Sequence, residues 1–226
     1  MSAKRIAILG GTGALGTGLA RRWTQAGHQV IIGSRSQDKA AEALEDLRRV
    51  MAERGASAEG VEAMENLEAA RAADVVVLTV PFAHQRNTLE HVKPALEGKV
   101  LVDVTVPLMP PKVGTVQLPP EGSAGQAAQL ICGEGVKVVS AFQNVAAHHL
   151  QEGHGIACDV LVCGNDKEAR ELVIGLVADC GMRGFHAGPI ANAAAAEALT
   201  SVIININRQF KCHAGIRITG TDDHGE

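Results

Sequence analysis

The sequence has very few aromatic side chains. Its 226 residues include no tyrosine, one tryptophan and four phenylalanines. Proteins that recognise single-stranded nucleic acids stack the bases on aromatic side chains, and this chain offers few such platforms. The 21 Lys and Arg residues are outnumbered by 25 Asp and Glu residues, and they form no run that could follow a phosphate backbone. We therefore expect no nucleic-acid partner.

The chain also lacks the cysteine pairs of disulfide or zinc scaffolds. Its five cysteines are odd in number, and no two are spaced as Cys-x-x-Cys; they are Cys132, Cys158, Cys163, Cys180 and Cys212. Such cysteines are typical of buried, reduced thiols. The N-terminus runs directly into an apolar strand and has no signal-peptide pattern. The apolar stretch at residues 190–206 is interrupted by polar side chains. We expect a cytoplasmic protein without a membrane segment.

Short apolar runs alternate with segments of helical periodicity along the whole chain. Strands are predicted at residues 6–9, 29–32, 74–80, 99–106, 136–141, 159–163 and 182–186. Helices are predicted at residues 15–27, 39–54, 84–96, 123–132 and 167–180, and a last one after Pro189. This alternation predicts an α/β fold, namely a Rossmann-type doubly wound parallel sheet with helices on both faces. We expect a dinucleotide-binding domain at residues 1–141 and a small C-terminal α+β domain at residues 142–226.

A glycine-rich loop follows the first predicted strand. Gly11, Gly13 and Gly16 reproduce the pattern G-x-G-x-x-G, and the loop opens an amphipathic helix. One glycine permits the tight turn, one lets the backbone approach a pyrophosphate, and one lets the helix pack close to the strand. The free N–H groups at the start of that helix attract the anion. The context predicts a dinucleotide site.

The end of the second strand favours NADP over NAD. NAD enzymes usually carry a carboxylate about 20 residues past the loop, to hold the ribose hydroxyls. Here the strand ends in Ser34 and Arg35, and Arg35 stands 19 residues after Gly16. A serine hydroxyl and a guanidinium suit the 2′-phosphate of NADP, and Lys39 adds a second charge one helical turn later.

The missing residue types exclude two common reaction mechanisms. Short-chain dehydrogenases use a tyrosine as general acid, and this chain has none. Hydroxyacid dehydrogenases use a helical lysine, and no lysine lies between Lys167 and Lys211. We therefore assign no catalytic side chain. The site suits direct hydride transfer between two cofactor-like rings, for which alignment supplies much of the rate.

The histidines leave several interpretations open. His84 follows a strand end, where it could contact the cofactor or serve only the start of a helix. His148, His149 and His154 match no common zinc spacing, so no metal is expected. From the residues alone, a reductase of a small imine, ketone, flavin or metal chelate remains open, as does a non-catalytic NADP(H)-binding module.

Nearly the whole chain resembles the NADPH-dependent reductases of the deazaflavin coenzyme F420. The segments that carry this resemblance are residues 8–13, 33–35 with Lys39, 77–81, 138–141, 162–166, 187–189, 197–200 and 205–207. Related chains can have a histidine where this one has Gln143. The C-terminal tail, residues 211–226, departs from the pattern of the family.

The resemblance implies two ligands and the residues that hold them. The cofactor, NADP, would contact Gly11, Thr12, Gly13, Ala14, Leu15, Gly16, Ser34, Arg35, Lys39, Thr79, Val80, Pro81, His84 and Ala146. Thr79 to His84 would flank the nicotinamide half. Coenzyme F420, as the small-molecule co-substrate, would enter a cleft formed by Thr105, Val106, Pro107, Gln143, Asn144 and Val145. Hydride would pass between the nicotinamide C4 and the deazaflavin C5.

The last predicted helix is apolar around much of its circumference. Ala193 to Ala196 are all alanine, and Leu199, Val202 and Ile206 follow. Such a helix is buried in the monomer or forms part of a symmetric interface. We expect a homodimer, to which the C-terminal domain contributes contacts.

Overall fold

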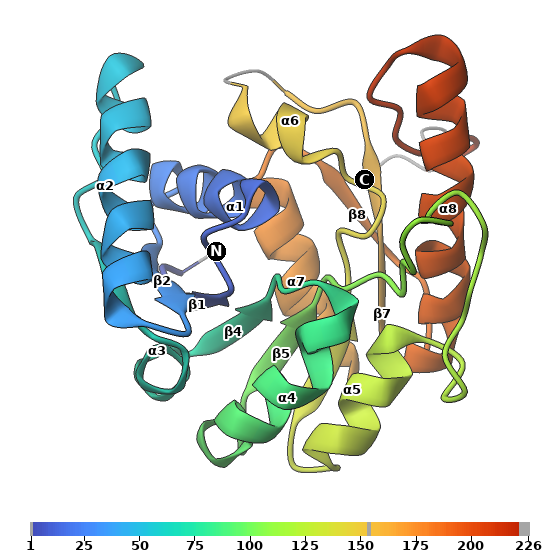
Figure 1. The fold of residues 1–226 in the computed structure, drawn as a ribbon, viewed down its shortest axis with the longest axis horizontal. Coiled ribbons are helices and arrows are strands. Elements are labelled where there is room, and N and C mark those ends of the chain that lie inside the picture. Colours follow the sequence, from blue (N-terminus) through green and yellow to red (C-terminus); the bar gives the residue numbers. More distant parts are fainter. Residues whose placement is uncertain (1, 153–154, 222–226) are drawn as a thin grey trace.

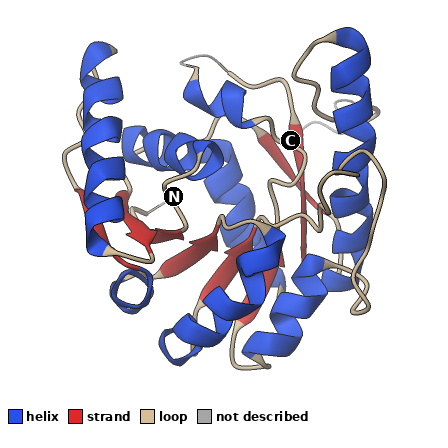
Figure 2. Ribbon diagram, viewed as in Figure 1, coloured by secondary structure: helices blue, strands red, loops and turns tan. Residues whose placement is uncertain are grey.

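One eight-stranded sheet runs through the molecule and is covered by helices on both faces. The computed structural model describes residues 2–152 and 155–221, and Figures 1 and 2 show the arrangement. The strands lie in the order β3-β2-β1-β4-β5-β6-β7-β8. Their bounds are β1 Arg5–Leu9, β2 Gln29–Ser34, β3 Val61–Glu65, β4 Val75–Leu78, β5 Val100–Asp103, β6 Lys137–Ser140, β7 Asp159–Gly164 and β8 Arg183–His186.

The helices follow the predicted alternation. The long ones are α1 Ala14–Gln25, α2 Gln37–Glu53, α4 Phe82–Val92, α5 Ala124–Cys132, α7 Lys167–Asp179 and α8 Ala193–Phe210; α3 Asn66–Ala72 and α6 Ala147–Gln151 are short, and 3₁₀ turns occupy Lys93–Ala95 and Ile190–Asn192. Among the helices of the described ranges, none has the length and apolar character that a membrane span needs.

Strand β1 shows why the short apolar runs became central strands. Ile6 and Ile8 join the hydrophobic cluster under α1, α2 and α7, whereas Ala7 and Leu9 join the cluster under α3, α4 and α5. Successive side chains of a strand point to opposite faces, so a strand covered on both faces must be apolar throughout. The first six strands are all parallel, from β3 to β6. The predicted Rossmann-type architecture is confirmed.

Three elements were not predicted. They are β3, α3 and α6, and all three are short. Strand β3 is only half-buried because it forms the edge of the sheet beside β2, so it lacks a continuous apolar run. Helix α3 has seven residues and α6 has five, and two turns are too few to display a helical period.

The last two strands depart from the parallel pattern of the first six. β7 pairs with β6 in the antiparallel direction, with Ser140 opposite Cys163, and β8 then runs parallel to β7. The chain reverses just after β6, where Phe142 adopts a φ of 72°. Its ring is buried edge-to-face against Trp23, 6.0 Å away. Buried strands have the same composition in either direction, so the sequence pattern could not show the reversal.

Helix α8 is fastened to the body of the protein by a buried carboxylate. Glu197 is 1% exposed and accepts hydrogen bonds from the backbone N–H groups of Ala124 (2.7 Å) and Gly125 (3.0 Å), at the start of α5. These donors satisfy N–H groups that have no partner inside their own helix. Burial raises the pKa of Glu197 to about 7, and nearby Asp103 adds to the effect.

This buried carboxylate predicts a pH dependence of stability. Because the pKa of Glu197 is raised on folding from 4.5 to about 7, the folded protein keeps a proton that the unfolded chain releases. Its contribution to stability is complete below pH 4.5 and is lost as the pH rises toward 7. Between pH 4.5 and pH 7 we expect the free energy of unfolding of the parent to fall. In Glu197→Gln it should fall by about 2 kcal/mol less, because the carboxamide does not titrate. Urea titrations at pH 4.5 and 7 measure this difference; equal slopes in both proteins would contradict it.

Candidate nucleotide and co-substrate site

The glycine-rich loop brings the end of β1 and the start of α1 into direct contact. A Cβ atom at Gly16 would lie 2.7 Å from the Cα of Gly11, so only glycine permits this approach. A Cβ atom at Gly13 would meet nothing within 4 Å, which leaves open space over the backbone. The left-handed conformation falls on Gly10, with φ of 70°, one residue before the predicted turn.

The start of α1 has the properties of an anion site. Its N-cap residue is Gly13, which has no side-chain oxygen to satisfy the first amides, and no acidic residue occupies the first turn. The unbonded N–H groups and the positive end of the helix dipole attract a phosphate. Thr12, Ala14 and Leu15 belong to this same loop and first turn.

The predicted 2′-phosphate residues lie together at the end of β2. Ser34 is buried at the last position of the strand, and Arg35 and Lys39 are exposed. Ser36 caps α2, where its hydroxyl accepts from the N–H of Lys39 at 3.4 Å. Within the part of the chain that the structure describes, the side chains of Arg35 and Lys39 have no hydrogen-bond or ion-pair partner. The two cations are therefore available to an anionic ligand.

These groups line a groove across the carboxyl ends of β1, β2 and β4. A cavity of about 170 Å³ is lined by Gly10, Thr12, Ser34, Arg35, Lys39, Asn66, Val80, Pro81, His84 and Thr88. A second cavity of about 240 Å³ shares Arg35, Asn66, His84 and Thr88 with it. The two cavities thus form one groove, and seven of the fourteen predicted cofactor residues line it.

Asn66 is a groove residue that the sequence reasoning missed. It begins α3, and its side-chain oxygen accepts from the N–H of Gly10 at 3.4 Å. This bond ties the edge of the groove to the glycine-rich loop. Because neither β3 nor α3 was predicted, no signal placed Asn66 at a strand end. Thr88 and Asn87 were missed too, although they lie on the predicted helix after His84.

The structure places His84 with Arg35. Its side chain is exposed on the first turn of α4 and lines both cavities. Thr79, in contrast, donates its hydroxyl to the carbonyl of Leu9 at 2.9 Å and so ties β4 to β1. His84 and Pro81 therefore lie at the same end of the groove as Ser34 and Arg35.

The predicted co-substrate residues gather where β5, β6 and α8 meet. The carboxamide of Gln143 donates to the carbonyl of Asp103 and to the hydroxyl of Ser140, both at 2.9 Å. The carbonyl accepts only, which fixes the nitrogen on that side. Gln143 is 7% exposed, and in the described residues its side-chain oxygen has no partner. A buried acceptor of this kind suits a ligand N–H.

Thr105 and Asn144 use their side chains inside the protein. Thr105 donates from its hydroxyl to Asp103 at 2.7 Å, and the carboxamide of Gln85 donates to both of them. Asn144 donates to the carbonyl of Ala196 at 2.8 Å. Burial raises the pKa of Asp103 to about 6, opposed by these hydrogen bonds. The two residues therefore position the backbone around Gln143.

The remaining predicted residues form the apolar part of this region. Pro107 and Val145 are buried, whereas Val106 is half-buried. Ala146 precedes α6, which packs against α1: a Cβ atom at Gly18 would lie 2.7 Å from that of Leu150. The Val145 to Ala146 turn thus lies between the co-substrate region and the helix of the phosphate loop.

The cysteines supply no reactive thiolate to this site. All five are free and four are buried. Burial raises the pKa of the Cys163 thiol to about 11 and that of Cys132 to about 12. These thiols stay protonated at neutral pH and act as small apolar side chains.

Comparisons with known proteins agree with this arrangement. The family model described as "NADP oxidoreductase coenzyme F420-dependent" matches residues 5–107. An F420-dependent NADP reductase of Methanocaldococcus jannaschii is 39% identical over 224 residues, which cover 96% of this chain and 99% of that protein. A second reductase of this name, from Methanothermobacter thermautotrophicus, is 38% identical over 95% of this chain and 94% of its own length.

A solved structure extends the likeness to three dimensions. A protein of an Arthrobacter species, proposed to be an F420-dependent NADP-reductase, superposes with a TM-score of 0.79 at 26% identity, covering 96% of this chain and all of its own. Together with the two sequence relatives, it shares both the fold and nearly the full length of this chain. The protein belongs to the family of coenzyme F420-dependent NADP oxidoreductases.

Proposed function

We propose that this protein transfers a hydride between NADPH and coenzyme F420, in either direction. The single observation that carries the proposal is the pair of half-sites that meet at the carboxyl end of one sheet. One half-site joins an uncapped glycine-rich helix start to Ser34, Arg35 and Lys39. The other ends at the side-chain oxygen of Gln143, which is buried and has no partner among the described residues. Membership of a family of this activity, at 39% identity over nearly the full length, supports the pairing.

The groove fits NADP with the phosphates at α1. The backbone at Gly13, where a Cβ atom would meet nothing within 4 Å, admits the pyrophosphate. Ser34, Arg35 and Lys39 bind the 2′-phosphate through charge-assisted hydrogen bonds. His84 and Pro81 line the same cavity as Arg35, so we assign them to the adenosine half of the cofactor rather than to its nicotinamide half.

We assign the co-substrate to the region beside Gln143, at the carboxyl ends of β5 and β6. We assign the Gln143 side-chain oxygen to a ring N–H of the deazaflavin, since it is a buried acceptor without a partner in the described residues. Pro107, Val106 and Val145 supply the apolar wall, and Ala146 faces the nicotinamide. Thr105 and Asn144 hold this wall in place through their internal bonds.

When both ligands are bound, the nicotinamide and the deazaflavin supply the redox chemistry themselves. The protein would hold the two rings against each other and exclude water, and such positioning lowers a barrier without a side-chain acid or base. The two buried carboxylates nearby, Asp103 and Glu197, are occupied by Thr105, Gln85 and the α5 amides. Their role is to hold β5, α5 and α8 in position relative to one another.

Mixing the purified protein with NADPH and oxidised F420 in a stopped-flow cell tests the proposed function. We expect rapid loss of the absorption band near ~420 nm that gives the coenzyme its name, and a much slower loss with NADH, because NADH lacks the 2′-phosphate. Tight binding of NADPH without loss of the band would overturn the proposal. Such a result would leave a reductase of another small acceptor or a binding module.

Arg35→Ala tests the cofactor half on its own. We expect it to weaken NADPH binding by about 1–3 kcal/mol and to leave NADH binding unchanged, because a charge-assisted contact to the 2′-phosphate is lost. Arg48→Ala is the matched control, since Arg48 is an exposed arginine of the following helix, α2, and pairs with Glu45. Fluorescence titration of both cofactors measures the effect; equal losses for NADPH and NADH in Arg35→Ala would refute the assigned role.

An apolar stripe on α8 supports a homodimer, which we propose as the working form. Val202, Ile206 and Phe210 recur every four residues and are 46%, 39% and 67% exposed. This spacing places them on one helix face, which suits a symmetric contact. Light scattering should give twice the chain mass of 23.5 kDa, and Ile206→Glu should halve it. A parent protein that scatters as one chain would contradict the dimer.

The cell compartment and the domain division also belong to this proposal. Five free cysteines suit the reducing cytoplasm, and recovery of the native protein from a secreted or membrane fraction would contradict that location. The division into a cofactor-binding part at residues 1–141 and a co-substrate part at residues 142–226 stays a prediction; β7 and β8 of the second part extend the sheet of the first.

A further inference from the structure

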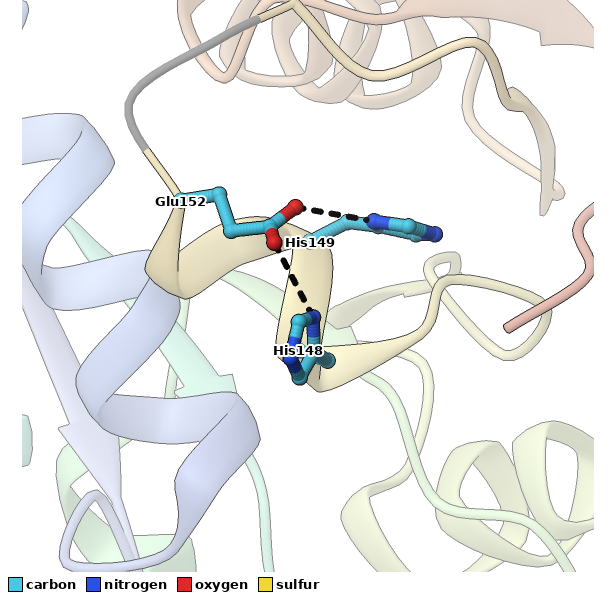
Figure 3. Close-up of side chains that lie close together, drawn as sticks. All are labelled: His148, His149 and Glu152. Atoms are coloured by element: carbon cyan, nitrogen blue, oxygen red, sulfur yellow. Dashed lines mark hydrogen bonds and ion pairs between the residues drawn. The ribbon is translucent and has the colours of Figure 1, made fainter. Parts of the chain in front are cut away.

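Four chemistry-bearing side chains gather at α6, outside the groove. His148, His149 and Glu152 stand at the end of this short helix, and His213 joins them from the C-terminal tail. Figure 3 shows the rings of His148 and His149 directed at the two oxygens of the Glu152 carboxylate. None of the four residues lines the groove cavities or has a part in the proposed hydride transfer.

The distances fit a small coordination sphere. The Nδ1 atom of His148 lies 3.4 Å from Oε1 of Glu152, and Nδ1 of His149 lies 3.3 Å from Oε2. One ligand atom from each of the three residues lies within 4.8 Å of the other two. Ligand atoms bound at 2.0–2.2 Å around a tetrahedral zinc ion are about 3.4 Å apart. The two nitrogen–oxygen distances match this spacing, and each histidine faces a different oxygen of the carboxylate.

The tautomer of His149 gives a second, independent indication. Its Nε2 atom lies 2.9 Å from the carbonyl oxygen of His213. A carbonyl only accepts, so Nε2 carries the hydrogen. In the neutral ring Nδ1 then carries a lone pair, which faces the carboxylate oxygen of Glu152. Two acceptors face each other, and a cation near both of them removes the repulsion.

The hydrogen bond from His149 to the His213 carbonyl is also of the kind that orients a metal-binding histidine. Histidines that bind a metal through one nitrogen usually donate the other N–H to a carboxylate or a backbone carbonyl, which orients the ring. Here the His213 carbonyl has this position. The His213 ring itself stacks on His148, with centroids 4.5 Å apart and planes 13° apart. The pair of rings thus has its orientation fixed from two sides.

We propose that His148, His149 and Glu152 bind a divalent transition-metal ion of the zinc type, with water completing the sphere. Two imidazole nitrogens and one carboxylate oxygen favour zinc, nickel or cobalt over the oxygen-preferring magnesium and calcium. The side chains are 55%, 32% and 35% exposed, so the ion can enter from solvent.

The ion would connect the tail to the helix of the phosphate loop. Arg22 of α1 donates to the backbone carbonyls of His149 and Glu152, and Gln151 donates to the carbonyl of Ala14 at 2.9 Å. Helix α6 is therefore already fixed on α1. An ion on His149 polarises the ring, strengthens its bond to His213 and orders the tail against α6. The site supports the fold beside the loop and takes no part in the chemistry.

Calorimetric titration with zinc tests the site directly. The full chain is stripped with a chelator and carries Cys212→Ser, because Cys212 is an exposed thiol that could bind zinc itself. At pH 7.5 we expect one zinc ion per chain and a higher melting temperature. The affinity should fall at least tenfold in His149→Gln. His91→Gln, which changes an exposed histidine of α4, is the matched control and should bind zinc as the parent does.

Three further measurements separate the site from a structural effect. Glu152→Gln keeps the backbone carbonyl that Arg22 contacts and should lose zinc to the same extent, so the test stands even if His149→Gln fails to fold. Cobalt should give the visible absorption bands of a low-coordinate site, and lowering the pH to 5.5 should weaken binding, because protons compete for the imidazoles. Zinc affinity equal in the parent and in both variants, or no binding at about 100 μM zinc, would overturn the proposal.

Discussion

The contact between Gly11 and Gly16 sets the position of the start of α1, on which the proposed phosphate site depends. A side chain at Gly16 would place an atom 2.7 Å from the Cα of Gly11, and relieving that overlap would push the start of α1 away from the end of β1. Because the helix begins directly over the strand, its first amides point into the groove. At a second glycine, Gly18, α6 packs on α1. The proposed phosphate site therefore depends on the approach of Gly16 to Gly11.

The second half of the site depends on a reversal rather than on a glycine. Phe142 takes the left-handed conformation with its ring packed on Trp23, which is a strained position for a large side chain. This geometry turns Gln143 back over the end of the sheet, where it bonds to Asp103 and Ser140. The buried carboxylate of Glu197 then holds α8 against α5. The hydrogen bonds of Glu197 and of the Gln143 nitrogen thus fix the arrangement of this region.

The sequence could predict those parts of the fold and of the site that rest on local patterns. The apolar runs of β1 and β4, the glycine loop and Arg35 all carry their signal within a few residues. Asn66 could not be predicted in the same way, because it begins a two-turn helix behind an edge strand. The antiparallel pairing of β7 was hidden because a buried strand reads alike in both directions. His149 and His213 stand 64 residues apart, so only the folded chain brings them together.

In the proposed reaction the hydride passes directly from one bound ring to the other, aligned by the protein and without an exchangeable proton from a side chain. An isotope experiment tests this transfer: NADPH carrying deuterium at the transferred C4 position is mixed with oxidised F420 and the enzyme in ordinary water. We expect mass spectrometry to find the deuterium at C5 of the reduced deazaflavin, with no dilution by solvent hydrogen. Reduced F420 with solvent hydrogen at C5 would contradict direct transfer and would require a side chain that relays protons.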